Sequence, residues 1–336
     1  MTKLIATLCF YLQLHRLAYY LNRNRKRVIT FHNVLTDDVF DNNIANGVSC
    51  SFSQFKAIIE EITKYFPFSL DLDDAKTVTI TFDDGYQNQV VVAAPYLLSK
   101  GIPAYLFVSG RLLQKGGGCE EKGKDALVID LLLHWVAYTP NGSYECELNG
   151  KSVCLELSDC NRYQIWGTIV WPAFVECPSS KGENILSALD SVYPILSILS
   201  ALPKKYVDQR LTGIRGEQLQ RLADNGWEIG WHTYSHFPLS KLSYKEKYKE
   251  LKPDVCIASK VLSYPYGGLC EVDSECLIIA KQLGYKAAVS NINIPNSLSE
   301  KWFRSRMSVS SNKVMLHFEL SGLKHLIKYH KLLPKI

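Results

Sequence analysis

Two short strings of this 336-residue chain carry side chains that can do metal chemistry. Thr81-Phe82-Asp83-Asp84-Gly85 places two adjacent carboxylates after an apolar run, and His232 and His236 lie four positions apart. Carboxylate oxygens and imidazole nitrogens are typical ligands of catalytic zinc, which takes three protein ligands and keeps one position open. These side chains therefore offer three ligands for one divalent metal ion, with zinc as the expected metal, and one carboxylate to act as a base.

Each string alone has a plainer interpretation. Asp-Asp-Gly is a common solvated turn, and a single histidine is usually an ordinary surface or core residue. His232 and His236 favour the functional interpretation because they follow a predicted strand, at a spacing that would place them on one face of a helix. Neighbouring side chains of a strand point in opposite directions, so one carboxylate can bind a metal while the other faces a substrate. Together these parts predict metal-assisted hydrolysis.

The elements that must position these residues alternate between strand and helix from residue 28 onward. Strand-like patterns are expected at residues 28–31, 77–82, 104–108, 227–231, 261–264 and 286–290. Helical patterns are expected at residues 53–66, 90–100, 216–225 and 274–283. This alternation indicates an α/β fold with a parallel sheet and crossover helices, and seven or eight such units close a barrel. Catalytic side chains of barrels lie at the C-terminal ends of the strands, where both strings are predicted to be.

Residues from about 111 to 212 interrupt this alternation. The segment 144–157 alternates apolar and polar residues on both sides of Asn149-Gly150, which is the signature of a β-hairpin with a tight turn. Residues 186–202 then have a helical pattern. We expect an inserted subdomain, containing a β-hairpin and helices, on one loop of a barrel that spans residues 28–330.

Composition excludes some classes of partner. The formal net charge is only +5, and no dense basic stretch interleaved with aromatic residues occurs, so nucleic acid is not an expected partner. The ten cysteines form no Cys-x-x-Cys pair, which in a chain of this length indicates reduced thiols in the cytoplasm.

Residues 1–27 predict an N-terminal apolar and basic helix. The apolar run from Leu4 to Leu14 is shorter than the roughly 20 residues that span a bilayer, and basic residues cluster from Arg23 to Arg27. A helix lying at the anionic surface of a membrane and a helix packed on the protein's own body both fit, and a signal peptide is a third interpretation. We expect a cytoplasmic protein in peripheral contact with the inner face of a membrane, with secretion as the alternative.

The two strings resemble the first two motifs of the polysaccharide deacetylases, the NodB-homology domain of carbohydrate esterase family 4. Four further segments agree with that family. Residues 31–34 resemble the Tyr-His-x-Val motif near the start of one branch, 101–108 the strand after the first motif, 263–267 the third motif, and 284–288 the segment after it. The resemblance covers about residues 28–110 and 213–310, and implies a deformed (β/α)7-type barrel.

The resemblance also implies roles for individual residues. Asp84, His232 and His236 would hold the metal, and Asp83 would be the general base. The backbone N–H of Tyr266 is expected to help stabilise the oxyanion.

The acid that protonates the leaving amine has two candidates. His32 is the first, from the Tyr-His-x-Val-like motif of one branch. His317 is the rival, because it resembles the apolar-apolar-His of the standard fifth motif, although a partly buried strand histidine is the preferred interpretation of that residue.

One position departs from the family pattern. The third motif usually begins with an arginine that orients the base, and Ser263 stands at that position. A permuted branch takes this arginine from elsewhere in the chain. Arg304 and Arg306 are candidates for that role, and otherwise are ordinary surface arginines.

The leading hypothesis is a metal-dependent hydrolase that removes acetyl groups, N-acetyl foremost, from a sugar of a surface polysaccharide or its lipid-linked precursor. An acetylated sugar, glycan or glycolipid is the expected partner. A catalytically lapsed glycan-binding module, supported by Ser263, and a metallohydrolase acting on amides other than sugars are the alternatives. Trp166, Trp171 and Trp231 could stack on sugar rings or belong to the core.

Overall fold

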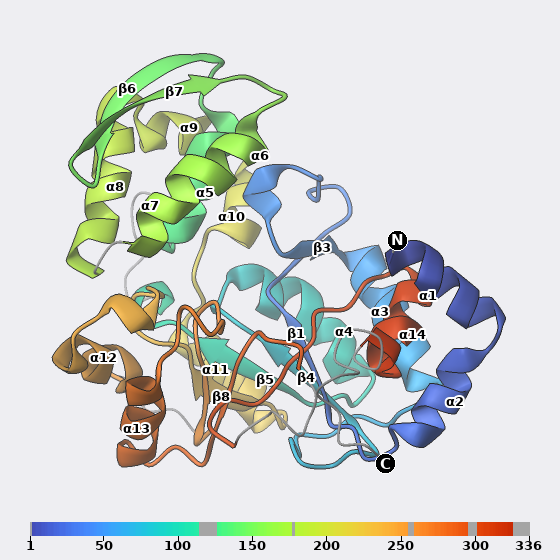
Figure 1. Cartoon of the computed structure of the whole chain (residues 1–336). Coiled ribbons are helices and arrows are strands. Elements are labelled where there is room, and N and C mark those ends of the chain that lie inside the picture. The colour runs from blue at the N-terminus through green and yellow to red at the C-terminus, as the bar shows by residue number, and fades with distance from the viewer. Residues whose placement is uncertain (1, 114–125, 177–178, 255–258, 295–300, 325–336) are drawn as a thin grey trace.

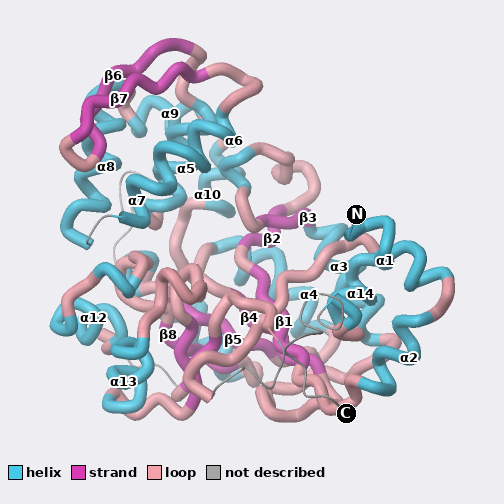
Figure 2. Tube along the Cα trace, in the orientation of Figure 1, coloured by secondary structure: helices cyan, strands magenta, loops and turns pink. Residues whose placement is uncertain are grey.

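A parallel sheet of six strands lies at the centre of the computed structural model, which describes residues 2–113, 126–176, 179–254, 259–294 and 301–324. Its strand order is β1-β4-β5-β8-β9-β10 (Figures 1 and 2). The strands are β1 Arg27–Phe31, β4 Val78–Phe82, β5 Ala104–Val108, β8 Glu228–Trp231, β9 Val261–Ser263 and β10 Ala287–Val289. Strands β1, β4 and β5 are buried along their whole length, as expected for a sheet covered on both faces.

The sheet curls so that one later segment connects its two edges. Arg304 forms a parallel bridge with Val289 of β10, and Met307 forms one with Ile29 of β1. The backbone N–H of Met307 donates to the Val28 carbonyl oxygen, which fixes this segment beside β1. The fold is therefore the deformed (β/α) barrel that the sequence predicts.

Helices surround this barrel. They are α3 Phe52–Thr63, α4 Ala94–Ser99, α11 Gly216–Asp224, α12 Tyr244–Leu251, α13 Ser274–Gln282 and α14 Lys313–Leu320. Helix α3 begins at a capping box formed by Ser51 and Gln54, and its apolar side chains, such as Phe55 and Ile62, are buried in the barrel core. The short parallel pair β2 Asn33–Leu35 and β3 Ser49–Ser51 lies between the barrel and the next unit (Figure 2).

A second unit stands between β5 and α11 in the chain, and has its own hydrophobic core (Figure 1). Its elements are α5 Val128–Tyr138, β6 Gly142–Leu148, β7 Lys151–Leu157, α6 Arg162–Ile165, α7 Trp171–Glu176, α8 Ser179–Val192, α9 Ile195–Ala201 and α10 Lys204–Arg210. Strands β6 and β7 pair in antiparallel orientation, and the turn residues Asn149 and Gly150 have φ values of 54° and 77°. These positive φ values are the ones that the Asn-Gly signature predicts.

The N-terminal segment forms two helices instead of the single one expected, α1 Thr2–Tyr11 and α2 Leu14–Leu21. The break lies at Gln13, whose φ of 58° is left-handed and ends the first helix. Both helices pack against α14. Within the described residues, no single helix is long and apolar enough to cross a membrane, and one bent pair, Glu183–Val192 with Ile195–Ala201, meets that test of length and composition.

Candidate active site and metal centre

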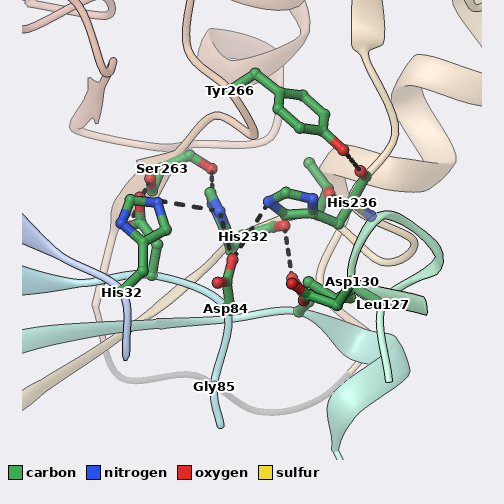
Figure 3. A network of polar contacts seen from close by, with 12 residues as sticks. His32, Asp84, Gly85, Leu127, Asp130, His232, His236, Ser263 and Tyr266 are labelled. Atoms are coloured by element: carbon green, nitrogen blue, oxygen red, sulfur yellow. Dashed lines mark hydrogen bonds and ion pairs between the residues drawn. The ribbon is translucent and has the colours of Figure 1, made fainter. Parts of the chain in front are cut away.

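Three potential metal ligands meet at the C-terminal ends of two neighbouring strands. Asp84 follows β4, while His232 and His236 follow β8, and one ligand atom from each lies within 4.8 Å of the other two. Asp84 Oδ1 is 3.6 Å from His232 Nε2 and 3.3 Å from His236 Nε2 (Figure 3). All three side chains are buried. The structure thus brings together the three residues that the sequence suggested as ligands.

The loop after β8 differs from the helix that we expected from the histidine spacing. Thr233 and His236 have φ values of 64° and 59°, so this segment turns back on itself instead of winding into a helix. The backbone N–H groups of Tyr234 and Ser235 donate to a carboxylate oxygen of Glu250, which holds the turn. Asp84 is left-handed too, with a φ of 81°. Such conformations cost of order 1–3 kcal/mol each and cluster at functional sites.

The ligand atoms fit a cation because the protein leaves them unpaired. Among the described residues, Asp84 Oδ1 and His232 Nε2 are buried without a hydrogen-bond partner. His232 Nδ1–H donates to the Ser263 carbonyl oxygen at 2.8 Å, which fixes the ring with Nε2 toward Asp84. Leaving buried polar atoms unpaired is unfavourable. A divalent cation between these side chains would satisfy them.

The electrostatics of the cluster suit metal binding. Burial acts to raise the pKa of Asp84, but its interaction with His236, 3.3 Å away, prevails and lowers this pKa to about 2. Burial lowers the pKa of His232 to about 4, so its imidazole is neutral near pH 7. Burial acts to lower the pKa of His236, whereas Asp84 raises it above its usual value. Asp84 and His232 are therefore in the ionisation states that metal binding requires.

Asp83 points to a buried arginine from a distant part of the chain. Arg306 Nη1 and Nη2 donate to the two carboxylate oxygens of Asp83 at 2.8 and 2.5 Å, and neither side chain is exposed. The Ser263 hydroxyl donates to Asp83 Oδ1 at 3.0 Å and accepts from Arg306 Nη2 at 2.9 Å. Burial acts to raise the pKa of Asp83, but the Arg306 charge holds this pKa well below its usual range. Arg306 thus contacts the carboxylate that the missing third-motif arginine would have oriented.

Arg304 does not share this role, so its candidacy as the orienting arginine is wrong. Its Nη1 and Nη2 donate to the carboxylate of Asp73 at 2.6 and 2.8 Å, and its Nη1 also donates to the Leu72 carbonyl oxygen. The physical reason is competition, because a bidentate carboxylate in the loop before β4 occupies the Arg304 guanidinium.

His32 and Tyr266 lie beside the cluster. His32 follows β1, and its Nε2 is 3.8 Å from Asp83 Oδ2 (Figure 3). The Tyr266 hydroxyl donates to the His236 carbonyl oxygen at 3.1 Å, and the two rings are 4.8 Å apart between centroids. Tyr266 has a φ of 57°, which is a fourth left-handed residue near the cluster.

His317, the rival acid, lies elsewhere. It belongs to helix α14 instead of a strand, and it is fully buried. Its Nε2 bonds to Glu61 at 3.0 Å, and its Nδ1 bonds to the Tyr19 hydroxyl at 2.9 Å. His317 therefore joins α14 to the N-terminal helices, and its candidacy as the leaving-group acid is wrong.

A cavity of about 570 Å³ opens onto the cluster, and both units of the molecule line it. The barrel contributes His32, Asp84, His236 and Tyr266. The second unit and the segment leading into it contribute mainly apolar and aromatic side chains, together with one buried acid and one buried base: Leu127, Ile129, Asp130, Leu133, Tyr163, Trp166, Trp171 and Arg210. Trp231 is instead fully buried and donates to the Glu250 carbonyl oxygen.

Sequence reasoning missed Asp130 and Arg210. Asp130 accepts hydrogen bonds from the Tyr86 hydroxyl and from Arg210 Nη2, so it connects helix α5 to the loop after β4. One signal could have found it, since Asp130 and His134 are the polar exceptions, at helical spacing, in the otherwise apolar stretch Val128–Ala137. No comparable signal points to Arg210.

Two of the comparisons with known proteins gave matches. The family model described as polysaccharide deacetylase matches residues 190–288, a range that includes His232, His236 and Ser263. The comparison with curated proteins gave no match. Among solved structures, the deacetylase PplD of Streptococcus pyogenes in complex with acetate has a TM-score of 0.50 at 13% identity, covering 89% of this chain and 97% of that one.

Two further solved structures are similar over most of this chain. IcaB from Ammonifex degensii has a TM-score of 0.48 at 13% identity, covering 89% of this chain and 98% of that one. A polysaccharide deacetylase from Bacillus cereus has a TM-score of 0.48 at 13% identity, covering 88% of this chain and 69% of that one. At such identities, the match to the streptococcal structure shows a common fold.

Proposed function

We propose that this chain, whose residues 190–288 match the polysaccharide deacetylase family model, is a sugar deacetylase that works with one divalent cation, zinc, held by Asp84, His232 and His236. The observation that carries this proposal is the meeting of three buried ligand atoms beside an arginine-bound carboxylate. These side chains lie at or beneath a cavity large enough for a sugar.

The proposed reaction is hydrolysis of an acetyl linkage, N-acetyl foremost. A bound divalent cation would polarise the acyl oxygen and lower the pKa of a water molecule. The carboxylate of Asp83 would take a proton from the attacking water, and Arg306 would keep both carboxylate oxygens in one orientation during that transfer. The water oxygen bonds to the acyl carbon, the bond from carbon to nitrogen breaks, and acetate and an amine leave.

Two further groups would complete the reaction. The backbone N–H of Tyr266 would donate to the developing oxyanion. His32 would give a proton to the departing nitrogen, and its position 3.8 Å from Asp83 keeps acid and base within one substrate's reach. The cavity position of these residues and the family pattern support both roles.

The cavity wall supports a sugar substrate. Trp166, Trp171 and Tyr163 lie on it, and aromatic rings can stack on the apolar face of a pyranose. We propose a sugar of a surface polysaccharide or of its lipid-linked precursor as the natural substrate. The alternative of a lapsed binding module rested on Ser263, and it loses that support because Arg306 supplies the arginine.

Metal analysis combined with acetate release tests the proposal. Wild-type protein is expected to hold one equivalent of zinc and to release acetate from oligomers of N-acetylglucosamine. Asp84→Ala should lose both the metal and the activity. Asp73→Ala is the matched control, because Asp73 pairs with Arg304 and does not line the cavity. Acetate release by Asp84→Ala at the wild-type rate would contradict the proposal.

A further inference from the structure

The first two helices carry their large apolar side chains on the outside. In α1 these are Leu4, Leu8 and Tyr11, spaced four and three residues apart, which places them on one face. The turn and α2 add five more. We call the whole set the docking face: Leu4, Leu8, Tyr11, Leu12, Leu14, Leu17, Tyr20 and Leu21. Each of these side chains is between 40% and 77% exposed.

The buried residues of the same helices are small or polar, while the aromatic side chains of Phe10 and Tyr19 are partly buried against His317. Ala6 and Cys9 of α1 and His15 and Ala18 of α2 are buried. The ring of His15 stacks on Phe10 with 4.8 Å between centroids. A helix that serves only its own protein turns its large apolar side chains toward the core, whereas most of the large apolar side chains of α1 and α2 face outward.

Several contacts hold the two helices against the body in this orientation. The Tyr19 hydroxyl bonds to His317 of α14, and the Asn22 side chain donates to the Ser321 carbonyl oxygen at 2.8 Å. The outward position of the apolar side chains is therefore fixed by specific polar bonds on the opposite side. Figure 1 shows both helices at the outer edge of the molecule, on the side away from the second unit.

The charges on this segment are of one sign. Residues 1–36 contain no aspartate or glutamate, and the first acidic residue is Asp37. Lys3, Arg16 and Arg23 are exposed, and the Arg23 guanidinium lies over the Tyr20 ring at 5.3 Å. An apolar face flanked by basic side chains is complementary to lipid acyl chains beneath anionic headgroups.

We propose that the docking face inserts α1 and α2 into the headgroup region of an anionic membrane, with their axes along its surface. Helices of 10 and 8 residues are too short to cross a bilayer, and the left-handed Gln13 between them prevents one continuous span. The inference is independent of the deacetylase site, because none of the described residues that line the cavity precedes His32.

Flotation with lipid vesicles tests the inference on the full chain. Vesicles of phosphatidylcholine alone are compared with vesicles that also contain phosphatidylglycerol. Wild-type protein is expected to float with the phosphatidylglycerol vesicles and to bind less to phosphatidylcholine alone. Binding should weaken as salt concentration rises, since screening reduces the attraction of the basic side chains.

Two sets of substitutions separate the apolar and the charged contributions. A docking-face variant carries four leucine-to-glutamine changes, and its vesicle affinity should fall at least about tenfold. Those changes are Leu4→Gln, Leu8→Gln, Leu17→Gln and Leu21→Gln. A charge variant carries Lys3→Gln, Arg16→Gln and Arg23→Gln, and each removed charge should weaken binding to anionic vesicles about fivefold.

A matched control changes four aliphatic side chains that are similarly exposed elsewhere in the described structure. Those changes are Val91→Gln, Leu196→Gln, Leu269→Gln and Ile278→Gln. The control should bind vesicles as the wild type does. Circular dichroism and acetate release from a soluble oligosaccharide are measured on every variant, so loss of folding or of activity is distinguished from loss of docking.

Three results would overturn the inference. If wild-type protein does not bind phosphatidylglycerol vesicles, the docking face does not bind an anionic membrane. If the docking-face variant floats as well as the wild type, another surface of the protein contacts the vesicles. If the wild type forms a dimer and does not bind vesicles, and the docking-face variant is a monomer, the face instead contacts a second copy of the chain.

Discussion

Two buried arginine–aspartate pairs differ in how completely the protein surrounds them: Asp130 and Arg210 line the cavity, while Asp83 and Arg306 lie beneath it. In the barrel, every nitrogen of the Arg306 guanidinium donates a hydrogen bond, and two of them go to Asp83. In the second unit, only Nη2 of Arg210 donates, to Asp130 and to the Ala45 carbonyl oxygen. Its Nε and Nη1 have no hydrogen-bond partner among the described residues.

The different surroundings of the two pairs indicate different roles. A bidentate pair with all donors used fixes a carboxylate in one orientation, which suits Asp83 as a base. The looser pair joins α5 and α10 of the second unit to the barrel, because Asp130 also accepts from Tyr86, two residues after Asp84. We therefore assign chemistry to the first pair and attachment of the cavity wall to the second.

Asp83→Asn should have the largest effect on turnover. Asparagine keeps the shape of the side chain but does not act as a base, so kcat is expected to fall about 10²- to 10⁴-fold. Zinc content should be unchanged, since the three ligands remain. We compare kcat and metal content between Asp83→Asn and Asp130→Asn. An equal loss of kcat in both variants would contradict the assignment of chemistry to the Asp83 pair alone.

Arg306→Met should have the next largest effect. The uncharged side chain leaves Asp83 buried without its main partner, so activity should fall about 10- to 100-fold and unfolding free energy by about 3–5 kcal/mol. Steady-state kinetics and denaturant titration measure the two quantities. Arg304→Met is the control, because its partner Asp73 is largely exposed and stays solvated without the arginine, so the loss of unfolding free energy should be smaller than in Arg306→Met.

Arg210→Met should separate stability from chemistry. Breaking a buried pair costs about 3–5 kcal/mol of unfolding free energy, as for Arg306. The loss of turnover, however, should be smaller than about tenfold, which is the smallest loss expected for Arg306→Met, because Arg210 contacts no reacting group. The kcat of both variants is measured at a temperature where both are folded. A loss of kcat in Arg210→Met as large as in Arg306→Met would show that the two pairs have equivalent roles.

Trp171→Ala should have the smallest effect and should appear in KM. Losing one aromatic contact is worth about 0.5–1.5 kcal/mol, which is roughly 2- to 13-fold in KM with kcat nearly unchanged. Trp302→Ala is the control, since Trp302 does not line the cavity. A fall in kcat without a change in KM would instead indicate that Trp171 acts by positioning Tyr266, which it contacts.

Much of the fold and the cluster could be predicted from the sequence, because local patterns determine them. The strand patterns, the Asn149-Gly150 turn and the helical pattern at residues 53–66 each act over a few residues. The two histidines and the pair of carboxylates could be identified because two strand ends of a parallel sheet meet at one edge, whereas the choice of Asp84 as the ligand came from the family resemblance.

Other features depend on contacts between distant segments. Arg304 and Arg306 are equivalent in sequence, and only the positions of Asp73 and Asp83 decide which arginine meets which acid. Asp130 and Arg210 lie 80 residues apart and give no paired signal. The secondary structure around His317 was predicted wrongly for a local reason. The Asn312 side chain accepts from the Met315 N–H and starts a helix, whereas the apolar-apolar-His pattern was interpreted as a strand.

Removal and return of the metal tests the central claim most directly. Wild-type protein is treated with a chelator, freed of it, and assayed for acetate release from oligomers of N-acetylglucosamine while zinc is added back. We predict that chelation reduces the rate to background, and that one equivalent of zinc restores it in the wild type but not in His232→Ala. Acetate release at an undiminished rate by protein shown to be metal-free would contradict the account.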